Sequence, residues 1–260
     1  MVCRIIDKMI NIFNTIIAFF KGIFSKPVAI FDPFLSGYLP TFSENFKSGI
    51  DWGKWTWVYP GDQDQKEKTV WDMECVQPRS DGLALIATRG NKVNVCGQIC
   101  SHRFLNILYG YISVTTKMPP KGFLYFPAIW MFNKNGWQPE IDIVELMGFD
   151  SKAATFTHHW LGADGNDKSE GKGVNLPIDL SQGFHNYSVE WTPDRLTWYL
   201  DGKKQYETTS NIPQVPLFLV CGIQAGPAGK GQPAFTHLYT ASEVPAEMVV
   251  KKIEIFQKQY

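Results

Sequence analysis

The feature that most constrains the fold is the near absence of helical periodicity after Leu39. Short apolar stretches alternate there with clusters of Gly, Pro, Asn and Asp, a pattern typical of strands separated by turns. Asp201-Gly202 lies between two such stretches and favours a two-residue hairpin. The clearest predicted strands are 55–59, 83–88, 110–118, 128–132, 141–147, 153–160, 185–191, 196–200, 216–223 and 248–257.

The composition supports one large all-β domain. The chain has 260 residues, 14% of them aromatic, with 22 Gly and 16 Pro. This aromatic content excludes disorder, and a chain of this length buries a core without disulfides or metals. We find no internal repeat and no domain-scale linker after residue 45. We therefore predict a monomeric, antiparallel two-sheet sandwich of the jelly-roll type over residues 41–260. We interpret the polar, Gly-rich stretch 162–175 as a long surface loop.

Charge and cysteine content exclude two further classes. Lys+Arg and Asp+Glu each number 25, so the basic excess of a nucleic-acid-binding protein is missing. The five cysteines include no C-x-x-C pair, which argues against zinc. Their odd number leaves at least one thiol unpaired. Free thiols are one interpretation; a Cys96–Cys100 disulfide, or one that involves Cys75, is the other.

Residues 1–26 differ from everything that follows. Between residues 4 and 25, apolar side chains recur at three- and four-residue steps, which predicts an amphipathic helix. Asn11, Asn14 and Lys21 interrupt the apolar run, so it is a poor transmembrane span. Three alternatives stay open: a signal peptide or signal anchor, an interfacial helix on a membrane, and a helix docked on a partner protein or on the domain itself.

The N-terminal segment ends at Lys26-Pro27, and we interpret residues 27–40 as a linker. Contact with a membrane surface or with another protein would then use residues 4–25. We expect an extracellular or cell-surface protein, although no clear cleavage site follows the apolar stretch.

The most informative motif is EIDIVE at residues 140–145, three acids within an apolar, β-branched run. Glu140 and Asp142 share one face of a strand, whereas Glu145 lies at an odd offset and would face the core. A carboxylate isolated in the core is costly. A β-bulge near residues 143–144 adds one residue and returns Glu145 to the face of the other acids. The motif therefore predicts both a bulge and an acid-lined face.

The same spacing limits the chemistry. Four pleat steps put the Cα atoms of Glu140 and Glu145 ~13 Å apart, so that side chains leaning together leave a gap of about 5 Å. Retaining glycosidases need about 5–5.5 Å between two carboxyl groups and inverting ones about 6.5–9.5 Å. Three close acids also raise at least one pKa, as a general acid requires. A structural acid patch or a calcium site is the alternative, but calcium sites usually lie on loops.

The acid motif, with the following Leu146-Met147-Gly148, resembles the E-x-D-x-x-E signature of family 16 of the glycoside hydrolases, in its laminarinase-like, bulged form. The resemblance covers about residues 41–257. Other segments that resemble the family are FSENF at 42–46, DGLAL at 81–85, YG at 109–110, KMP at 117–119, PAIW at 127–130, FHNY at 184–187, EWTP at 190–193 and YLDG at 199–202.

The resemblance implies a concanavalin-like jelly roll and retaining hydrolysis of internal β-1,3 or β-1,4 bonds in glucans or galactans. It implies Glu140 as the nucleophile, Asp142 as its assistant and Glu145 as the acid/base. No cofactor is required; a structural calcium ion, as in some similar proteins, has no visible ligand set here. Two departures concern the substrate: Ser113 and Thr115 replace the Glu and Arg of E-A-R, and Cys221 replaces an Asn of a late cleft strand.

Three further residues are candidates for substrate binding. Similarity to the family puts Trp130 in the cleft as a sugar platform, since an aromatic face buries the C–H face of a pyranose. Trp137 lies three residues before Glu140 in a Gly/Pro-flanked loop. His159 shares a strand face with two threonines and so is expected to reach the sugar or Glu145. Core packing is the alternative for Trp130, and a satisfied structural histidine for His159.

The sequence thus favours a retaining endo-β-glycanase that acts on a polysaccharide. We expect a β-1,3 or mixed β-1,3/1,4 glucan, because the acid motif and Trp137-Gln138-Pro139-Glu140 look laminarinase-like. The alternatives are a galactanase of the agarase, porphyranase or carrageenase type, a transglycosylase, and a carbohydrate-binding sandwich without catalysis. The presence of all three acids argues against the last.

Overall fold

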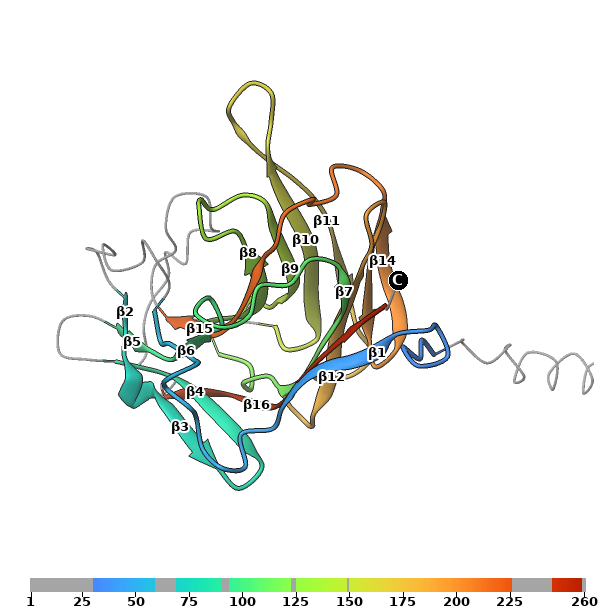
Figure 1. Ribbon diagram of the computed structural model, residues 1–260. Helices are drawn as coiled ribbons and strands as arrows, with labels where there is room; N and C mark the ends of the chain where they lie inside the picture. The colour runs from blue at the N-terminus through green and yellow to red at the C-terminus, as the bar shows by residue number, and fades with distance from the viewer. Residues whose placement is uncertain are drawn as a thin grey trace, which may run out of the picture.

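The computed structural model describes residues 30–58, 69–89, 94–122, 125–148, 150–225 and 245–258. These residues form two sheets that lie face to face (Figure 1). The six-stranded sheet has the order β11-β10-β9-β8-β15-β6. Its strands are β6 (Gln98–Cys100), β8 (Tyr125–Phe132), β9 (Glu140–Glu145), β10 (Ala153–Leu161), β11 (Asp167–Asn175) and β15 (Phe218–Ala225).

The ten-stranded sheet has the order β14-β13-β12-β7-β16-β4-β5-β2, with β1 added to β16 and β3 added to β4. Its pairs are antiparallel except β2 with β5. Its strands are β1 (Leu39–Glu44), β2 (Thr69–Trp71), β3 (Val76–Arg79), β4 (Gly82–Arg89), β5 (Asn94–Cys96), β7 (Gly110–Lys117), β12 (His185–Trp191), β13 (Leu196–Leu200), β14 (Lys203–Thr208) and β16 (Ala246–Gln257). The predicted all-β, two-sheet sandwich is confirmed.

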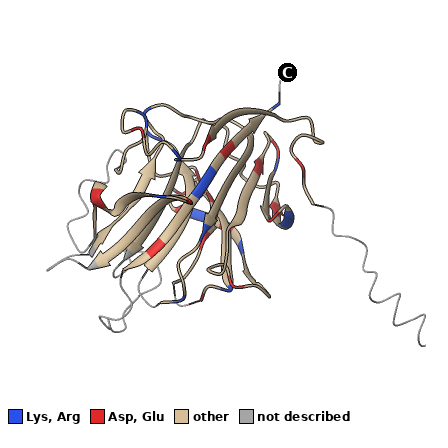
Figure 2. Ribbon diagram, turned by 90° about the horizontal axis from the view of Figure 1, so that it is seen from below, with Lys and Arg blue, Asp and Glu red and all other residues tan. Residues whose placement is uncertain are grey.

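The core lies between the sheets and is built from alternate strand residues, such as Ile112 and Val114 of β7 and Ile141 and Ile143 of β9. One short 3-10 helix, η2 (Met73–Cys75), interrupts the strands of the described part. No described helix has the length and hydropathy that crossing a bilayer requires. Acidic and basic residues are interspersed over the strands (Figure 2), in keeping with the balanced charge of the sequence.

Local sequence explains the predicted hairpin. Asp201 and Gly202 connect β13 to β14 and both have positive φ, 49° and 72°. Both central residues of a type I′ turn need this conformation, which Gly adopts freely and Asp tolerates.

The predicted linker 27–40 is wrong over its described part. The ring of Phe31 lies 4.9 Å from that of Tyr111 and 4.6 Å from that of Tyr199, on the outer face of the ten-stranded sheet. The Tyr38 hydroxyl donates a hydrogen bond to buried Glu190 (3.0 Å), and β1 begins at Leu39. The chain is ordered here because aromatic side chains bury against the sheet. The predicted helix 1–26 lies outside the described residues.

Two other predictions also differ from the structure. Residues 167–175, which we expected in a surface loop, form the edge strand β11, and its hairpin with β10 projects from the sandwich (Figure 1). The predicted strand 55–59 is reduced to a single bridge between Thr56 and Cys100, while Tyr59 lies outside the described residues.

The four described cysteines, Cys75, Cys96, Cys100 and Cys221, are buried, and none of these four forms a disulfide bond. Cys96 belongs to the main core, whereas Cys100 belongs to a separate cluster on the other face of the six-stranded sheet. The alternative of a Cys96–Cys100 disulfide is therefore wrong.

Candidate active site

The three acids of β9 share one face because the strand contains a bulge. Glu145 and Asp142 lie opposite Thr155 and Thr157 of β10, so the two residues 143 and 144 face only one residue of the partner strand. On the other side, the register against β8 also shifts between these positions. The predicted bulge is confirmed, and Ile143 and Val144 both pack in the core.

We call this outer side of the six-stranded sheet the acid-bearing face. It is defined by Glu140, Asp142 and Glu145, and the register places three rows of residues across the strands. Written from β11 through β10, β9 and β8 to β15, they are Ser169–His159–Glu140–Phe132–Phe218, Gly171–Thr157–Asp142–Trp130–Val220 and Gly173–Thr155–Glu145–Ala128–Gly222.

The two flanks of the acids differ in character. Toward β8, β15 and β6 the face is an apolar cluster that is separate from the main core. Toward β10 and β11 it carries hydroxyls, an imidazole and glycine backbone. The acids thus lie where an apolar surface meets a polar one, an arrangement suited to a sugar, whose ring has both kinds of surface.

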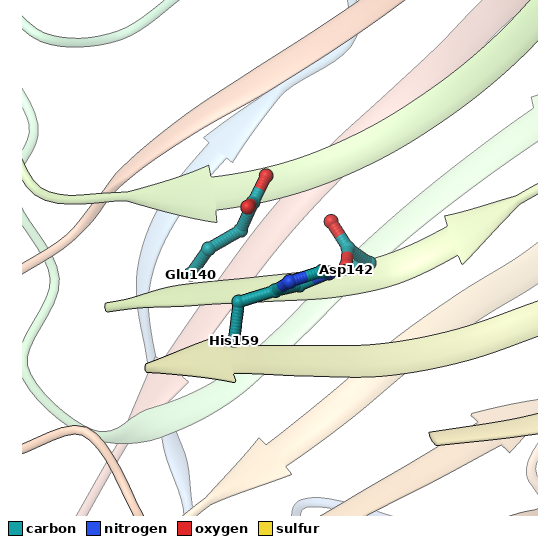
Figure 3. Close-up of side chains that lie close together, drawn as sticks. All are labelled: Glu140, Asp142 and His159. Carbon is teal, nitrogen blue, oxygen red and sulfur yellow. Dashed lines mark ion pairs between the residues drawn. The ribbon is translucent and has the colours of Figure 1, made fainter. Parts of the chain in front are cut away.

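Glu140, Asp142 and His159 converge (Figure 3). One carboxylate oxygen of each acid and one imidazole nitrogen all lie within 4.8 Å of one another. His159 Nε2 is 3.3 Å from Asp142 Oδ2, and the two acids are 5% and 3% exposed. His159 was expected to reach the sugar or Glu145; in the structure its partner is Asp142, and contact with a sugar stays a prediction.

Burial dominates the electrostatics of the acids. It raises the pKa of Glu140 well above the usual range, and the charges of Asp142 and Glu145 raise it further, against a hydrogen bond from Trp137. The pKa of Glu145 is also raised well above its usual range, mainly by burial and then by the charge of Asp142. Burial also raises the pKa of Asp142, although His159 opposes this. The three carboxyl groups therefore retain at least one proton near neutral pH.

The histidine itself titrates above its ordinary range. Burial alone lowers the pKa of His159, but the carboxylates of Asp142 and Asp167 outweigh burial and raise it. Asp167 Oδ2 lies 3.5 Å from His159 Nδ1, and Gln138 Nε2 donates a hydrogen bond to Asp167 Oδ1 (2.8 Å).

The ten-stranded sheet supports β9, the strand that carries the three acids, from the opposite side of the core. Trp198 of β13 is fully buried, and its indole Nε1 donates a hydrogen bond to the backbone oxygen of Asp142 (2.8 Å). This bond crosses the core and satisfies a carbonyl beside the bulge, where the regular ladder is interrupted.

The two candidate tryptophans occupy different environments. Trp130 lies on the acid-bearing face opposite Asp142, but it is only 9% exposed. Trp137 is 47% exposed, and its ring stacks on Phe132 at 5.0 Å. Trp137 therefore offers the accessible aromatic surface, while Trp130 forms part of the layer beneath.

The sequence departures noted above lie away from this face. Ser113 and Thr115 of β7 accept hydrogen bonds from Asn186 Nδ2 on the outside of the ten-stranded sheet. Cys221 packs in the main core. Neither departure therefore lies on the acid-bearing face.

Sequence reasoning missed Asp167, Gln138 and the bond from Trp198. Asp167 and Gln138 approach each other only because β11 pairs with β10 and brings its first residue beside His159. The segment 167–175 contains two glycines, two acids and a single apolar residue, Val174, so it gives no strand signal. Trp198 packs in the core, as its apolar surroundings in the sequence favour, but its hydrogen-bond partner has no sequence signature.

Within the described residues, Glu140, Asp142 and His159 form the group of side chains that could hold a metal ion. The group does not fit a calcium ion, which takes six to eight oxygen ligands and no imidazole nitrogen.

Comparison with known proteins gives the family. The sequence profile of the glycosyl hydrolases family 16 matches residues 63–239. A β-glucanase of Paenibacillus polymyxa is 28% identical over 217 residues, which cover 81% of this chain and 79% of that protein. A β-glucanase of Acetivibrio thermocellus is 39% identical over 121 residues, which cover 45% of this chain and 34% of that protein.

Solved structures confirm the fold. The laminarinase catalytic domain of Thermotoga maritima superposes with a TM-score of 0.71 at 23% identity, covering 86% of this chain and all (100%) of that one. The β-glucanase of Bacillus licheniformis gives 0.69 at 22% identity, with 86% and 99% coverage. With the profile match over most of the chain and the acid motif on one face of the sandwich, the chain belongs to family 16 of the glycosyl hydrolases.

Proposed function

We propose that this protein is a retaining endo-β-glucanase that cleaves internal β-1,3 or mixed β-1,3/1,4 bonds. The observation that carries the proposal is the bulge of β9, which gathers three carboxyl groups, those of Glu140 and Asp142 buried and that of Glu145 partly buried, on one sheet face beside an exposed tryptophan. Relatives named β-glucanase and glucan endo-1,3-β-glucosidase support the choice of a glucan.

In the proposed reaction, Glu140 attacks the anomeric carbon while Glu145 gives its proton to the departing glycosidic oxygen. A covalent glycosyl-enzyme forms, and the leaving chain departs with the proton. Glu145, now ionised, takes a proton from a water molecule that attacks the same carbon and releases Glu140. Two inversions give net retention.

The electrostatics support these roles. A general acid must hold its proton near neutral pH, and burial together with Asp142 raises the pKa of Glu145 as this requires. The nucleophile must be ionised, whereas burial raises the pKa of Glu140 too. The hydrogen bond between the two acids raises the pKa of Glu140 and opposes the rise at Asp142. We propose that substrate binding shifts the shared proton to Asp142, whose O–H then donates a hydrogen bond to the ionised Glu140 carboxylate.

We propose that Trp137 carries a glucosyl ring near Glu140, with Trp130 and Phe132 supporting the apolar flank. His159 would orient Asp142 and reach a sugar hydroxyl. The polar flank of Thr155, Thr157 and β11 would then receive another part of the chain. These assignments rest on the accessible stack of Trp137 and the register across the sheet.

The function is tested by incubating purified protein with laminarin, lichenan, agarose, porphyran and carrageenan and measuring new reducing ends. We expect rapid loss of chain length with laminarin or lichenan and none with the galactans. Glu140→Gln and Glu145→Gln should be inactive, while Glu74→Gln, a change at an exposed acid of η2, should not affect activity. Cleavage of a galactan alone would support the galactanase alternative, and sugar transfer to an added oligosaccharide would identify a transglycosylase.

We also propose that the protein works outside the cell or at its surface, with residues 4–25 in contact with a membrane. Ile30, Phe34 and Leu35 support this, because they are exposed apolar residues just after that amphipathic segment. Co-sedimentation of the full chain with anionic vesicles tests it. Binding should fall in Phe34→Ser/Leu35→Ser and persist in Leu161→Ser, a change at an exposed apolar residue elsewhere. A bracing calcium ion stays a prediction, checked by the change of Tm on chelation.

A further inference from the structure

We propose that Glu140, Asp142 and His159 bind a zinc-type divalent cation, and that the bound ion reversibly blocks the acid-bearing face. A glycosidase of this type needs no metal for its reaction, so the site would be inhibitory. The binding stands on geometry alone; only its effect on turnover rests on the role proposed for Glu140.

The first support is the spacing of the ligand atoms. Two atoms bound at about 2.0–2.1 Å to a tetrahedral zinc ion are about 3.3–3.4 Å apart. Asp142 Oδ2 and His159 Nε2 are 3.3 Å apart, so their separation already matches that of two ligand atoms on a tetrahedral zinc ion. A Glu140 oxygen lies within 4.8 Å of both ligand groups, so a small rotation of one flexible side chain completes three ligands.

The second support is the carboxylate behind the histidine. A metal-bound imidazole usually donates its other N–H to a carboxylate, which fixes its orientation and strengthens the metal bond. Asp167 Oδ2 is 3.5 Å from His159 Nδ1, on the opposite side of the ring from Asp142. Gln138 Nε2 holds Asp167 through a 2.8 Å hydrogen bond. The carboxylate therefore lies behind the imidazole as such an arrangement requires, although its 3.5 Å contact with Nδ1 is an ion pair rather than a hydrogen bond among the described residues.

The third support is Asp142 itself. Its side chain is 3% exposed, and among the described residues its Oδ2 atom receives no hydrogen bond of good geometry, although His159 approaches it. A buried carboxylate oxygen without a donor is costly. A cation in contact with Asp142 and Glu140 would neutralise both acids at the point where their charges are closest.

The types of ligand atom in this group determine which metal ion it would bind. One imidazole and two carboxylates suit Zn²⁺ or Cu²⁺, whereas Ca²⁺ and Mg²⁺ prefer oxygen ligands only. Three protein ligands leave the fourth zinc position to water. Because an oxygen of Glu140 would then be bound to the ion, it could not attack a sugar. Zinc and glucan therefore compete for the same face.

The direct test is calorimetric titration of the full chain with Zn²⁺, Mg²⁺ and Ca²⁺, without substrate. We expect one zinc ion per chain and no heat with Mg²⁺ or Ca²⁺. His159→Gln and Asp142→Asn should abolish zinc binding, and Asp167→Asn should weaken it about 10- to 100-fold. Glu145→Gln, which changes an acid outside the cluster, should bind zinc normally. His185→Gln is the matched histidine control, because His185 pairs with Asp201 on the other sheet.

Circular dichroism of each variant separates loss of the site from loss of the fold. Zinc binding that is unchanged in His159→Gln and Asp142→Asn, or absent from the wild-type chain, would overturn the proposal. Kinetics add the inhibitory part: zinc should raise KM for laminarin without lowering kcat, and EDTA should restore KM. Since the titration needs no turnover, a protein that binds zinc but cleaves no glucan would refute the proposed function and leave the site standing.

Discussion

At its bulge, β9 has one residue more than the neighbouring strand β10, and this extra residue brings Glu145 to the acid-bearing face. Without the bulge, alternation would direct Glu145 into the core, where Ile143 and Val144 now pack. The bulge interrupts the regular backbone pairing at one position, and it places a third carboxyl group on the acid-bearing face. At the scale of residues, the proposed chemistry therefore depends on a β-bulge, beside which Trp198 donates a hydrogen bond to the Asp142 carbonyl.

Gathering acids in a buried position lowers stability. The folded-state pKa of Glu145 is raised, so the folded chain binds more protons than the unfolded chain between the ordinary and the raised pKa. Stability contributed by protonated Glu145 is therefore present at low pH and lost as pH rises through that interval. Glu145→Gln should raise Tm at pH 7 but leave it nearly unchanged at pH 4, whereas Glu74→Gln should change neither. A wild-type advantage in Tm at pH 7 would contradict the raised pKa.

The exposed ring of Trp137 leads to a second prediction about a single residue. Trp137→Ala should raise KM for the preferred glucan several-fold, since one aromatic platform contributes about 0.5–1.5 kcal/mol beyond buried area. Because the side chain is half exposed, Tm should change little. Leu161→Ala, at another exposed apolar residue, should leave KM unaltered. A Trp137→Ala variant with wild-type KM would exclude this residue from the substrate contact.

At the scale of elements, the strongly alternating strands could be predicted and the others could not. Core residues recur at every second position in β12, in β7 and in β9 before its bulge, which is what the pattern detects. By contrast, β11 is an edge strand with mostly exposed residues and two glycines, so it resembles a loop in sequence. Segment 30–38 packs through Phe31 and Tyr38 onto residues far along the chain, a contact that no local pattern encodes.

The docked segment makes a prediction about truncation. Removing residues 1–29 should preserve Tm, whereas removing residues 1–38 should lower it, because the Phe31 stack and the Tyr38 bond to Glu190 would both be lost. Tyr38→Phe isolates the hydrogen bond and should cost about 1.5–3 kcal/mol, as expected for a bond to a charged group. Urea unfolding followed by fluorescence measures these differences. Equal stability of the two truncated chains would show that segment 30–38 contributes nothing.

At the scale of the whole molecule, the two sheets have different tasks. The six-stranded sheet carries the three acids of the motif, and the ten-stranded sheet supports it through the core and through Trp198. The sequence alone supported the sandwich, the three acids and His159 on one face. It could not place Asp167 or Gln138, because their positions depend on pairing between β10 and β11.

The coupling between the sheets is testable with two buried tryptophans. Trp198→Phe and Trp191→Phe each remove an indole hydrogen bond to a backbone oxygen, that of Asp142 or that of Pro213. Each should lower the free energy of unfolding by about 1–3 kcal/mol. Only Trp198→Phe should also lower kcat, because only Trp198 bonds to the backbone of an acid of the motif, Asp142. An equal loss of kcat in both variants would mean that destabilisation alone, rather than support of β9, reduces activity.

The roles of Glu140 and Glu145 are the central claim, and azide rescue with an activated β-glycoside tests them most directly. In Glu140→Ala the nucleophile is missing, so azide should enter its space, attack the sugar and give an α-glycosyl azide. In Glu145→Ala the glycosyl-enzyme still forms, so azide should attack it from the other face and give a β-glycosyl azide. Proton NMR couplings at the anomeric carbon identify each product. The reversed pattern would exchange the two roles, and an inverted anomeric centre in wild-type hydrolysis would contradict the covalent mechanism itself.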